Sequence, residues 1–378
     1  MSAVSPRERL RGDLVRLVHR GAGVRDFALG AVRILARVVP FDGACVLTLD
    51  PATRLPTREV VENGLPAATA RRMAEIEIGG NDVNGFDALA RSESRAATLS
   101  EATGGDLDRS LRHRELRRPN GFGDELRAAL VDDAAAWGAI TLLRTSDREH
   151  FAPDDATLVA SVSAYLAEGL RRAMLLTAVS AEQANDEESA GLLLLGSDDS
   201  ITLADAVAER WLAELRETSR GQPLPPVVAA VASRARSIVD GRAAASAIAR
   251  ARVRTASGRW LLVRGSMLGA EADAPTAVII EAARPHELAP LIADAYGLTE
   301  RERAVTQLVA QGLPTQKIAR GLHISPWTVQ DHLKSLFEKV DVSTRGELVA
   351  RMFFDHYVPR LIDGAAAAEL HARRVPRG

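Results

Sequence analysis

Residues 298–354 read LTERERAVTQLVAQGLPTQKIARGLHISPWTVQDHLKSLFEKVDVSTRGELVARMFF, which predicts four short helices joined by tight turns. Thr299 and Glu302 can form a capping box at the start of the first helix, because each side chain can satisfy an orphan backbone donor. Gly312 is expected to end this helix, and a second should begin near Thr315. Apolar spacings of three and four predict these core-facing side chains in the two helices: Val305, Leu308, Val309, Ile318 and Leu322.

The third helix carries the decisive pattern. Ser325 can cap its start, and Pro326 suits the first helical position because its missing donor would be unpaired there. The stripe expected to face the core consists of Val329, Leu333, Leu336, Phe337 and Val340. The opposite face mixes amide, ammonium and carboxylate groups, which can hydrogen-bond base edges, and it consists of Trp327, Gln330, Asp331, Lys334 and Glu338. Two such helices, joined by a short turn expected to contain Gly321, make a helix-turn-helix.

Basic residues support nucleic-acid binding only weakly. The chain has three lysines, Lys317, Lys334 and Lys339, and all lie in this stretch, whereas every other basic residue is an arginine. A compact, flexible cation suits a phosphate contact, although Lys317 can equally be a solvated surface residue. Residues 298–354 hold eight Lys or Arg and six Asp or Glu, a net charge of +2. So small a charge favours a dimer on paired half-sites.

The same stretch resembles the LuxR-type (NarL/FixJ-type) DNA-binding domain. The matching motifs are LTERE at 298–302, KIA at 317–319, ISPWTVQDHLKSLFEKV at 324–340 and STR at 343–345. The resemblance implies base-reading roles for Gln330, Asp331 and Lys334. It implies phosphate contacts or approaches for a second set, Thr328, His332, Lys339 and Arg345, and we add Ser325 and Lys317 to the DNA-binding candidates. A helical bundle without a DNA role is the competing interpretation.

Two residues depart from the family pattern. Pro314 replaces the Asn or Ser common before the second helix, and Asp331 places an anion near phosphates, although a carboxylate can accept from cytosine N4. A fourth helix is expected from Thr344, with a second capping box to Glu347. In the resembled family the exposed face of this helix forms a two-fold contact, which implies a symmetric dimer.

Composition places the chain among globular proteins. It has 378 residues, 46% apolar and 26% charged, so two or three domains are expected. No apolar run is long enough to span a bilayer, and the N-terminus shows no export signal, so we expect a cytoplasmic protein without a membrane partner. The single Cys45 excludes an internal disulfide and a multi-cysteine zinc site, and it is expected as a buried hydrophobe. No metal and no cofactor are expected.

The first half of the chain predicts an α+β domain. Its closing segment, GAITLLRTSDREHFAPDDATLVASVSAYLAEGLRRA at 138–173, resembles a GAF domain, a family that commonly holds a small ligand between its sheet and a long connection. We expect helices at 26–38 and 67–75, strands at 43–50, 58–62, 124–131 and 137–144, and a polar connection at 79–120.

A dense basic run lies in that connection. Two interpretations stay open for it: an anion-binding lid, or a solvated helix balanced by Asp106, Asp108 and Glu115. The run consists of Arg109, Arg112, His113, Arg114, Arg117 and Arg118. The helix from Asp154 to about Gln183 shows an apolar seam that could pair with the same helix of a second copy, made of Leu158, Val162, Tyr165, Gly169, Ala173 and Leu176.

A second sensor-like region follows an acidic break at 182–189. One strand at 192–195, a helix at 206–215 and three strands at 253–255, 260–266 and 276–282 are expected. The opening GLLLLGSDDSITLADAVAERWL at 191–212 resembles a PAS domain, with Asp205 where that family often has Asn. A structural spacer is the alternative.

Catalytic signatures are missing from the sequence. No P-loop, GxGxxG, HExxH or GxSxG lies in a suitable context, and the adjacent Asp124 and Glu125 would point to opposite faces of a strand. The chain is therefore expected not to be an enzyme but a one-component transcriptional regulator.

The expected domains are a GAF-like region (1–181), a PAS-like region (190–285), a helix-turn-helix domain (294–357) and a tail (358–378). The expected partners are double-stranded DNA, a second copy, a small ligand of open identity in the GAF-like domain, and RNA polymerase. The alternative function is a protein-interaction scaffold whose DNA contact is incidental.

Overall fold

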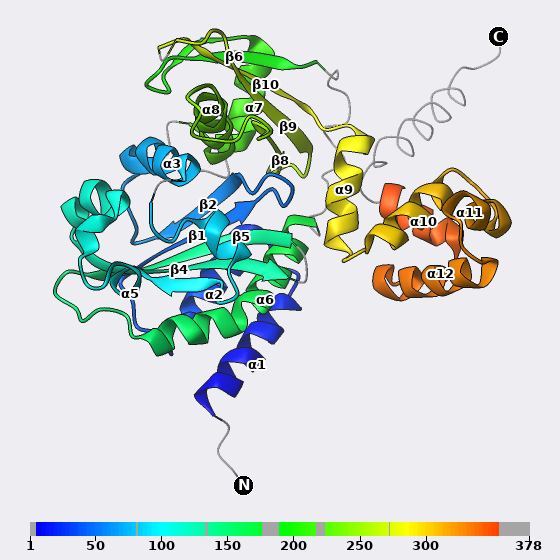
Figure 1. Ribbon diagram of the computed structural model, residues 1–378, viewed down its shortest axis with the longest axis horizontal. Coiled ribbons are helices and arrows are strands. Elements are labelled where there is room, and N and C mark those ends of the chain that lie inside the picture. The colour runs from blue at the N-terminus through cyan, green and yellow to red at the C-terminus, as the bar shows by residue number, and fades with distance from the viewer. Residues whose placement is uncertain are drawn as a thin grey trace, which may run out of the picture. The chain divides into compact units, whose positions relative to one another are not determined.

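The computed structural model describes residues 5–80, 82–132, 135–175, 189–216, 224–271 and 273–354. Residues 5–175 and 189–282 form one compact unit, and residues 283–354 form a second. The first unit holds two five-stranded antiparallel sheets with helices, and the second is helical (Figure 1). This arrangement confirms the predicted class, two α+β regions followed by a helical domain. None of the described helices is long and apolar enough to cross a membrane.

The first sheet has the strand order β2-β1-β5-β4-β3. Strands β1, β2, β4 and β5 lie where the sequence predicts them, and β3 is an unpredicted edge strand that pairs with β4. Their bounds are β1 Gly43–Leu49, β2 Pro56–Glu62, β3 Ala96–Thr98, β4 Phe122–Asp132 and β5 Ala135–Thr145. Strands β4 and β5 are buried almost continuously, because both faces of this sheet are covered.

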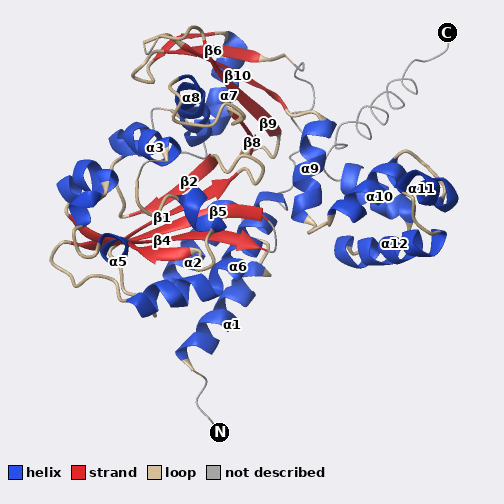
Figure 2. Cartoon of the chain, viewed as in Figure 1, coloured by secondary structure: helices blue, strands red, loops and turns tan. Residues whose placement is uncertain are grey.

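Helices α2 Val24–Leu35 and α6 Pro153–Leu175 cover one face of the first sheet, and α1 Pro6–Val18 packs on these two helices (Figure 2). The seam on α6 does not serve a second copy as predicted. Val162, Gly169 and Ala173 are buried inside their own domain, and a Cβ at Gly169 would overlap the ring of Phe27. The apolar period of α6 is therefore used by α1, α2 and the sheet, which corrects the prediction. Leu176 and the predicted extension to Gln183 lie outside the described residues.

The polar connection covers part of the other face. The predicted helix before it is formed by a 3-10 turn Ala67–Thr69 and α3 Ala70–Gly79. The connection itself contains α4 Phe86–Arg91 and α5 Leu99–Thr103, the 3-10 turns Leu107–Arg109 and Arg118–Asn120, and a π-helical turn His113–Arg117. Part of the basic run turns inward. Arg112 is fully buried, with Nε donating to Glu125 at 2.9 Å and a terminal nitrogen to Asp82 at 2.9 Å.

The solvated-helix interpretation of this run is therefore wrong for Arg112 and Arg117, while Arg114 between them is exposed. Arg117 is also buried, and its Nε donates to Glu125 at 3.1 Å. Burial raises the pKa of Glu125, but the guanidinium groups of Arg112 and Arg117 outweigh burial and hold that pKa well below its usual range. Arg118 does lie exposed beside Asp108, as the solvated interpretation expects.

The second sheet has the order β7-β6-β10-β9-β8. Counted from its own first strand, this is the connectivity of the first sheet. Its strands are β6 Gly191–Leu195, β7 Ile201–Ala204, β8 Arg250–Arg254, β9 Trp260–Met267 and β10 Thr276–Ala282, of which β7 is unpredicted. Helices α7 Ala206–Arg216 and α8 Pro226–Val239 pack on it, and α8 also contacts β2 and α3 of the first sheet's domain (Figure 1).

A buried ion pair joins the two sheets. Asp50 follows β1 and Arg252 lies in β8. The Nε of Arg252 and its backbone N–H donate to one carboxylate oxygen of Asp50 at 2.9 and 2.7 Å, and a terminal nitrogen donates to the other at 2.7 Å. Both side chains are buried. The two sheets are thus fixed to each other by a bidentate contact.

The second unit contains α9 Pro285–Ala295, α10 Glu300–Ala310, α11 Thr315–Leu322, α12 Pro326–Val340, α13 Arg345–Val349 and a π-helical turn Ala350–Phe354. The predicted helix phases are confirmed. The buried core of α10 to α12 includes Val305, Val309, Ile318, Val329, Leu333, Leu336 and Val340, while Leu308, Leu322 and Phe337 are half-buried.

Candidate functional site

The start of α12 is fixed by the predicted cap. The hydroxyl of Ser325 accepts from the backbone N–H of Thr328 at 3.0 Å, and Pro326 occupies the first helical position. The hydroxyls of Ser325 and Thr328 also lie 2.9 Å apart. The cap holds the first turn of the helix in one conformation, so side chains projecting from that turn have fixed origins.

The turn between α11 and α12 does not use the expected glycine. Gly321 lies within α11, and the residue that reverses the chain is His323, with φ 54° and ψ 45°. This is the left-handed conformation, in which a helix end most often places glycine. A histidine in this conformation leaves no signal in the sequence, which explains why the prediction placed Gly321 in the turn instead.

The outer face of α12 is open. Gln330, Asp331 and Lys334 are exposed, and none of them has a hydrogen bond or ion pair within the described part of the chain. Lys317 is exposed on α11, and His332 is half-buried on α12. Amide, carboxylate and ammonium groups thus stand together on one exposed helix face.

A buried carboxylate supports this face from behind. Glu302 accepts from Ser335 at 2.7 Å, from Lys339 at 2.7 Å and from the N–H of Thr299 at 2.8 Å. Lys339 also donates to the carbonyl of Gly297 at 3.0 Å. Burial raises the pKa of Glu302, but the hydrogen bonds from Lys339, Ser335 and Thr299 outweigh it and lower that pKa to about 2. The ammonium of Lys339 is therefore engaged inside its own domain, and its phosphate role stays a prediction.

Arg345 has a similar internal role. Its guanidinium donates to the hydroxyl of Thr315 at 2.7 Å and to the carbonyl of Leu313 at 3.3 Å, which ties α13 to the start of α11. The second capping box is half formed. Thr344 accepts from the N–H of Glu347 at 3.1 Å, but the Glu347 carboxylate accepts from Ser343 rather than from Thr344.

The helical arrangement agrees with the comparison of sequences. The sequence model of the bacterial regulatory proteins of the luxR family matches residues 297–352. These residues are a LuxR-type helix-turn-helix domain. It is a DNA-binding domain, and the relatives that share it are transcriptional regulators.

The LuxR-type domain is similar to those of characterised bacterial proteins. It is 48% identical over 56 residues to the transcriptional regulatory protein UhpA of Escherichia coli, covering 15% of this chain and 29% of UhpA. It is 44% identical over 54 residues to the nitrate/nitrite response regulator NarL of E. coli, covering 14% and 25%. The chain thus matches under a third of the length of these relatives, and the similarity concerns this domain alone.

Solved structures give weaker likenesses. Escherichia coli SdiA aligns with 92% of this chain and 98% of its own at 12% identity and a TM-score of 0.31. The phycoerythrobilin-bound GAF domain of a cyanobacterial phytochrome aligns with 46% of this chain and 98% of its own at 12% identity and a TM-score of 0.32. Scores this low do not establish a shared fold.

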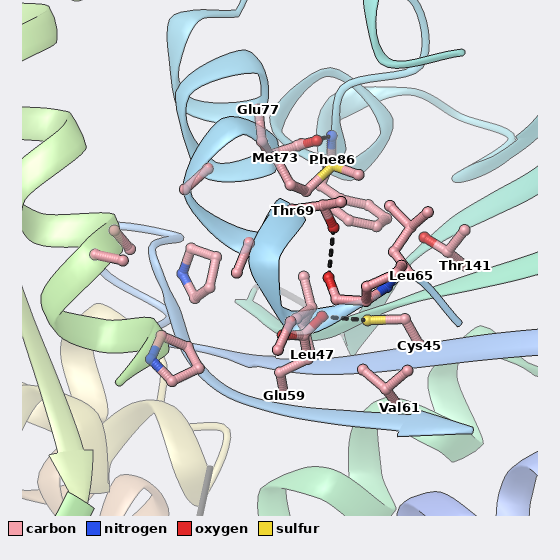
Figure 3. Close-up of a pocket in the computed structure, with 18 of the residues that line it drawn as sticks. Cys45, Leu47, Glu59, Val61, Leu65, Thr69, Met73, Glu77, Phe86 and Thr141 are labelled. Atoms are coloured by element: carbon pink, nitrogen blue, oxygen red, sulfur yellow. Dashed lines mark hydrogen bonds between the residues drawn. The ribbon is translucent and has the colours of Figure 1, made fainter. Parts of the chain in front are cut away.

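A cavity of about 230 Å³ lies beside the first sheet (Figure 3). Its floor includes Cys45 and Leu47 of β1 and Glu59 and Val61 of β2, and Met73 of α3 lies across from them. Three small residues of α8 complete the lining: Pro226, Ala229 and Ala230. Walls from both sheet domains therefore meet around one space.

Polar groups gather at one part of this lining. The Cys45 thiol donates to Glu59 at 3.1 Å, and burial together with the Glu59 carboxylate raises the pKa of Cys45 well above its ordinary value. Cys45 is half-buried against the cavity. Because its pKa is raised, its thiol is protonated and weakly nucleophilic. Arg127 stacks 3.6 Å from the Phe86 ring centre and donates to Glu77 at 2.6 Å.

Arg117 is the least satisfied of these groups. It lines the cavity, and its Nε pairs with Glu125, but neither terminal nitrogen has an acceptor in the described part of the chain. Burial lowers the pKa of Arg117, Glu125 opposes this, and Arg112 and Arg127 lower it further. Sequence reasoning singled out the basic run but could not tell which of its members faces a cavity.

Proposed function

We propose that the chain is a one-component transcriptional regulator that binds operator DNA as a symmetric dimer and senses a small molecule in the cavity of its first sheet. The open face of α12 carries this proposal: Gln330, Asp331 and Lys334 are exposed and unpaired in the described structure, whereas the other face of the helix is buried. Such a helix can enter a major groove without rearranging its own domain.

The proposal assigns base readout to these three residues. Gln330 can form a bidentate pair of hydrogen bonds with adenine, Lys334 can donate to guanine, and Asp331 can accept from cytosine N4. Thr328, His332, Lys339 and Arg345, together with Lys317, are proposed phosphate contacts. Lys339 and Arg345 also hold the surface in place through their internal bonds. Since DNA lies in the cytoplasm of a bacterium, we place the protein there.

The dimer is proposed to form through the fourth helix. With a net charge of +2 the domain attracts phosphates weakly, so one copy alone should bind a half-site poorly. Two copies related by a two-fold axis would bind two half-sites one helical turn apart. Contact with RNA polymerase is a further part of the proposal.

The cavity is proposed as the sensor site. Its lining is largely apolar, and the unpaired terminal nitrogens of Arg117 suit a carboxylate or carbonyl oxygen at one end of an apolar ligand. Because α8 forms part of the wall, an occupant contacts both sheet domains at once. Such a ligand changes the protein's affinity for DNA only if it binds the DNA-bound and the DNA-free arrangements of the protein with different affinities.

Selection from random duplex DNA with the full-length chain tests the DNA-binding part. We expect an enriched pseudo-palindrome. Lys334→Ala should lose about 1–3 kcal/mol on that duplex and relax the base preference at one position per half-site. Arg301→Ala removes an exposed cation of α10 and serves as the matched control, expected to keep both affinity and preference. An even loss by Lys334→Ala on all sequences would make Lys334 a phosphate contact.

Native mass spectrometry of the protein from its own host tests the sensor part. We expect a small molecule to remain bound, and Arg117→Met to release it without unfolding the protein. Exposed Arg118→Met is the matched control, since Arg118 pairs with Asp108 away from the cavity lining.

If no duplex is enriched in the selection from random DNA, the alternative of an interaction scaffold is favoured instead.

A further inference from the structure

One exposed side chain on α12 has no part in the proposed hydrogen-bonding readout of bases. Trp327 is 76% exposed, while the next most exposed large apolar side chain in the described structure, Leu268, reaches 55%. The indole has no hydrogen bond, ring contact or ion pair within the described part of the chain. A tryptophan is large and costly to leave in water, so this one is unusual within the domain.

Helix geometry places Trp327 on the reading face. At about 100° per residue, Lys334 lies about 20°, Asp331 about 40° and Gln330 about 60° around the helix axis from Trp327. The buried Val329 and Leu336 lie about 160–180° away by the same count. Trp327 therefore projects from the same side of α12 as the three proposed base readers, about one turn nearer the N-terminus than Gln330 and Asp331 and about two turns nearer than Lys334.

The position in the helix is the one that approaches bases most closely. Trp327 follows Pro326 in the capped first turn, and the N-terminal residues of a recognition helix are those that contact base edges. The Ser325 cap and the φ of Pro326 fix the direction of its Cα–Cβ bond. An indole held there presents a flat apolar surface to the floor of the groove.

We propose that Trp327 reads a thymine in each half-site by covering its C5 methyl group. The major groove offers one apolar feature, the thymine methyl, and apolar side chains recognise it by contact. Gln330, Asp331 and Lys334 read hydrogen-bonding groups, so Trp327 supplies the readout that those three cannot. This assignment rests on the proposed DNA binding and adds a specificity residue to it.

Fluorescence can test the contact, because Trp327 is optically distinct. Trp137, Trp211 and Trp260 are 0%, 5% and 8% exposed, so acrylamide should quench chiefly Trp327 in the free protein. Adding the enriched duplex to the full-length chain should protect this emission. Trp327→Phe should remove the quenchable component and leave the melting temperature unchanged, which confirms the assignment of the signal.

A thymine-to-uracil scan of the enriched duplex tests the readout, because uracil lacks only the methyl. We expect one position per half-site where uracil weakens binding about fourfold, the factor that corresponds to about 0.8 kcal/mol for one buried methyl. The same uracil should have no effect with Trp327→Ala and a retained effect with Trp327→Phe. Each variant keeps the exposed site and its cap, so folding should be unaffected.

The outcomes separate this assignment from the proposed function. Binding without protection of the indole overturns the Trp327 contact and leaves the regulator intact. Protection without any uracil position that depends on Trp327 overturns the thymine assignment. Failure to enrich any duplex overturns both.

Discussion

At the residue scale, the packing of the LuxR-type domain depends on side-chain contacts that the sequence does not predict. Glu302 was expected only as half of a capping box, yet it also binds Ser335 and Lys339 of α12. The capping box is visible in sequence because its two residues are three apart. The bonds to α12 are invisible, because those partners lie 33 and 37 residues away.

Glu302 should make the domain acid-sensitive. Its pKa is lowered to about 2 in the folded state from an ordinary value of 4.5, so its ionised form contributes stability above about pH 4.5. That contribution, about 1–3 kcal/mol, is lost as pH falls from 4.5 towards 2. Hydrogen exchange of the α10 and α12 amides should show this loss.

Glu302→Gln supplies the comparison. At pH 7 the α10 and α12 amides of the variant should be less protected from hydrogen exchange than those of the parent. This difference in protection should vanish as the pH falls from about 4.5 towards 2. Glu300→Gln, an exposed neighbour, should behave like the parent. A gap that stays constant with pH would mean that Glu302 acts by packing alone.

His323 gives a second residue-scale prediction. Its left-handed backbone disfavours a side chain with a Cβ, so His323→Gly should stabilise the domain by about 0.5–1 kcal/mol. Gln316→Gly, at an exposed position inside α11, should instead destabilise it by about 1 kcal/mol. Urea unfolding of the three proteins measures both, and equal effects would remove the conformational explanation.

At the element scale, local patterns predicted most of the fold. Helices α10 to α12 and strands β1, β4, β9 and β10 lie close to their expected bounds, because periodicity and caps are local signals. Strands β3 and β7 have three and four residues, too few to show alternation. The α6 seam was correctly read as apolar, but periodicity does not say whether the partner is a second copy or the helix's own sheet.

Packing at Gly169 distinguishes those two partners. Gly169→Leu should destabilise the first unit by about 1–3 kcal/mol, because the new side chain must displace the ring of Phe27. Tyr165→Leu, at a seam position that is 37% exposed, should change stability by less than about 0.5 kcal/mol. Thermal unfolding at two protein concentrations is the measurement. A concentration-dependent loss in Gly169→Leu would restore the dimer seam.

At the scale of the whole molecule, the buried charges were beyond sequence reasoning. Arg112 and Glu125 are 13 residues apart, and Asp50 and Arg252 are 202 apart, so nothing local marks them as partners. A charged run reads as a solvated surface unless its partners are known. The open face of α12 was predictable because it follows from the period of a single helix.

The Asp50–Arg252 pair should hold the two sheets as one folding unit. Arg252→Met leaves a buried carboxylate without its cation and should cost about 3–5 kcal/mol. Adding Asp50→Asn should recover part of this loss, because the uncompensated charge is gone. Calorimetry should show the single variant melting its second sheet earlier than the first. Coincident melting with no loss would show that α8 alone couples them.

The small side chains of α8 over the cavity have a consequence for the kind of signal the protein can report. Pro226, Ala229 and Ala230 offer no long side chain that could change rotamer, so on this side of the cavity a larger ligand is accommodated by displacing α8 itself, whereas Met73 on the α3 side can change rotamer. Helix α8 packs on β8, β9 and β10, and the second sheet would travel with it. A ligand that fits the cavity would then leave the second sheet in place, whereas a larger ligand that displaces α8 would move the second sheet.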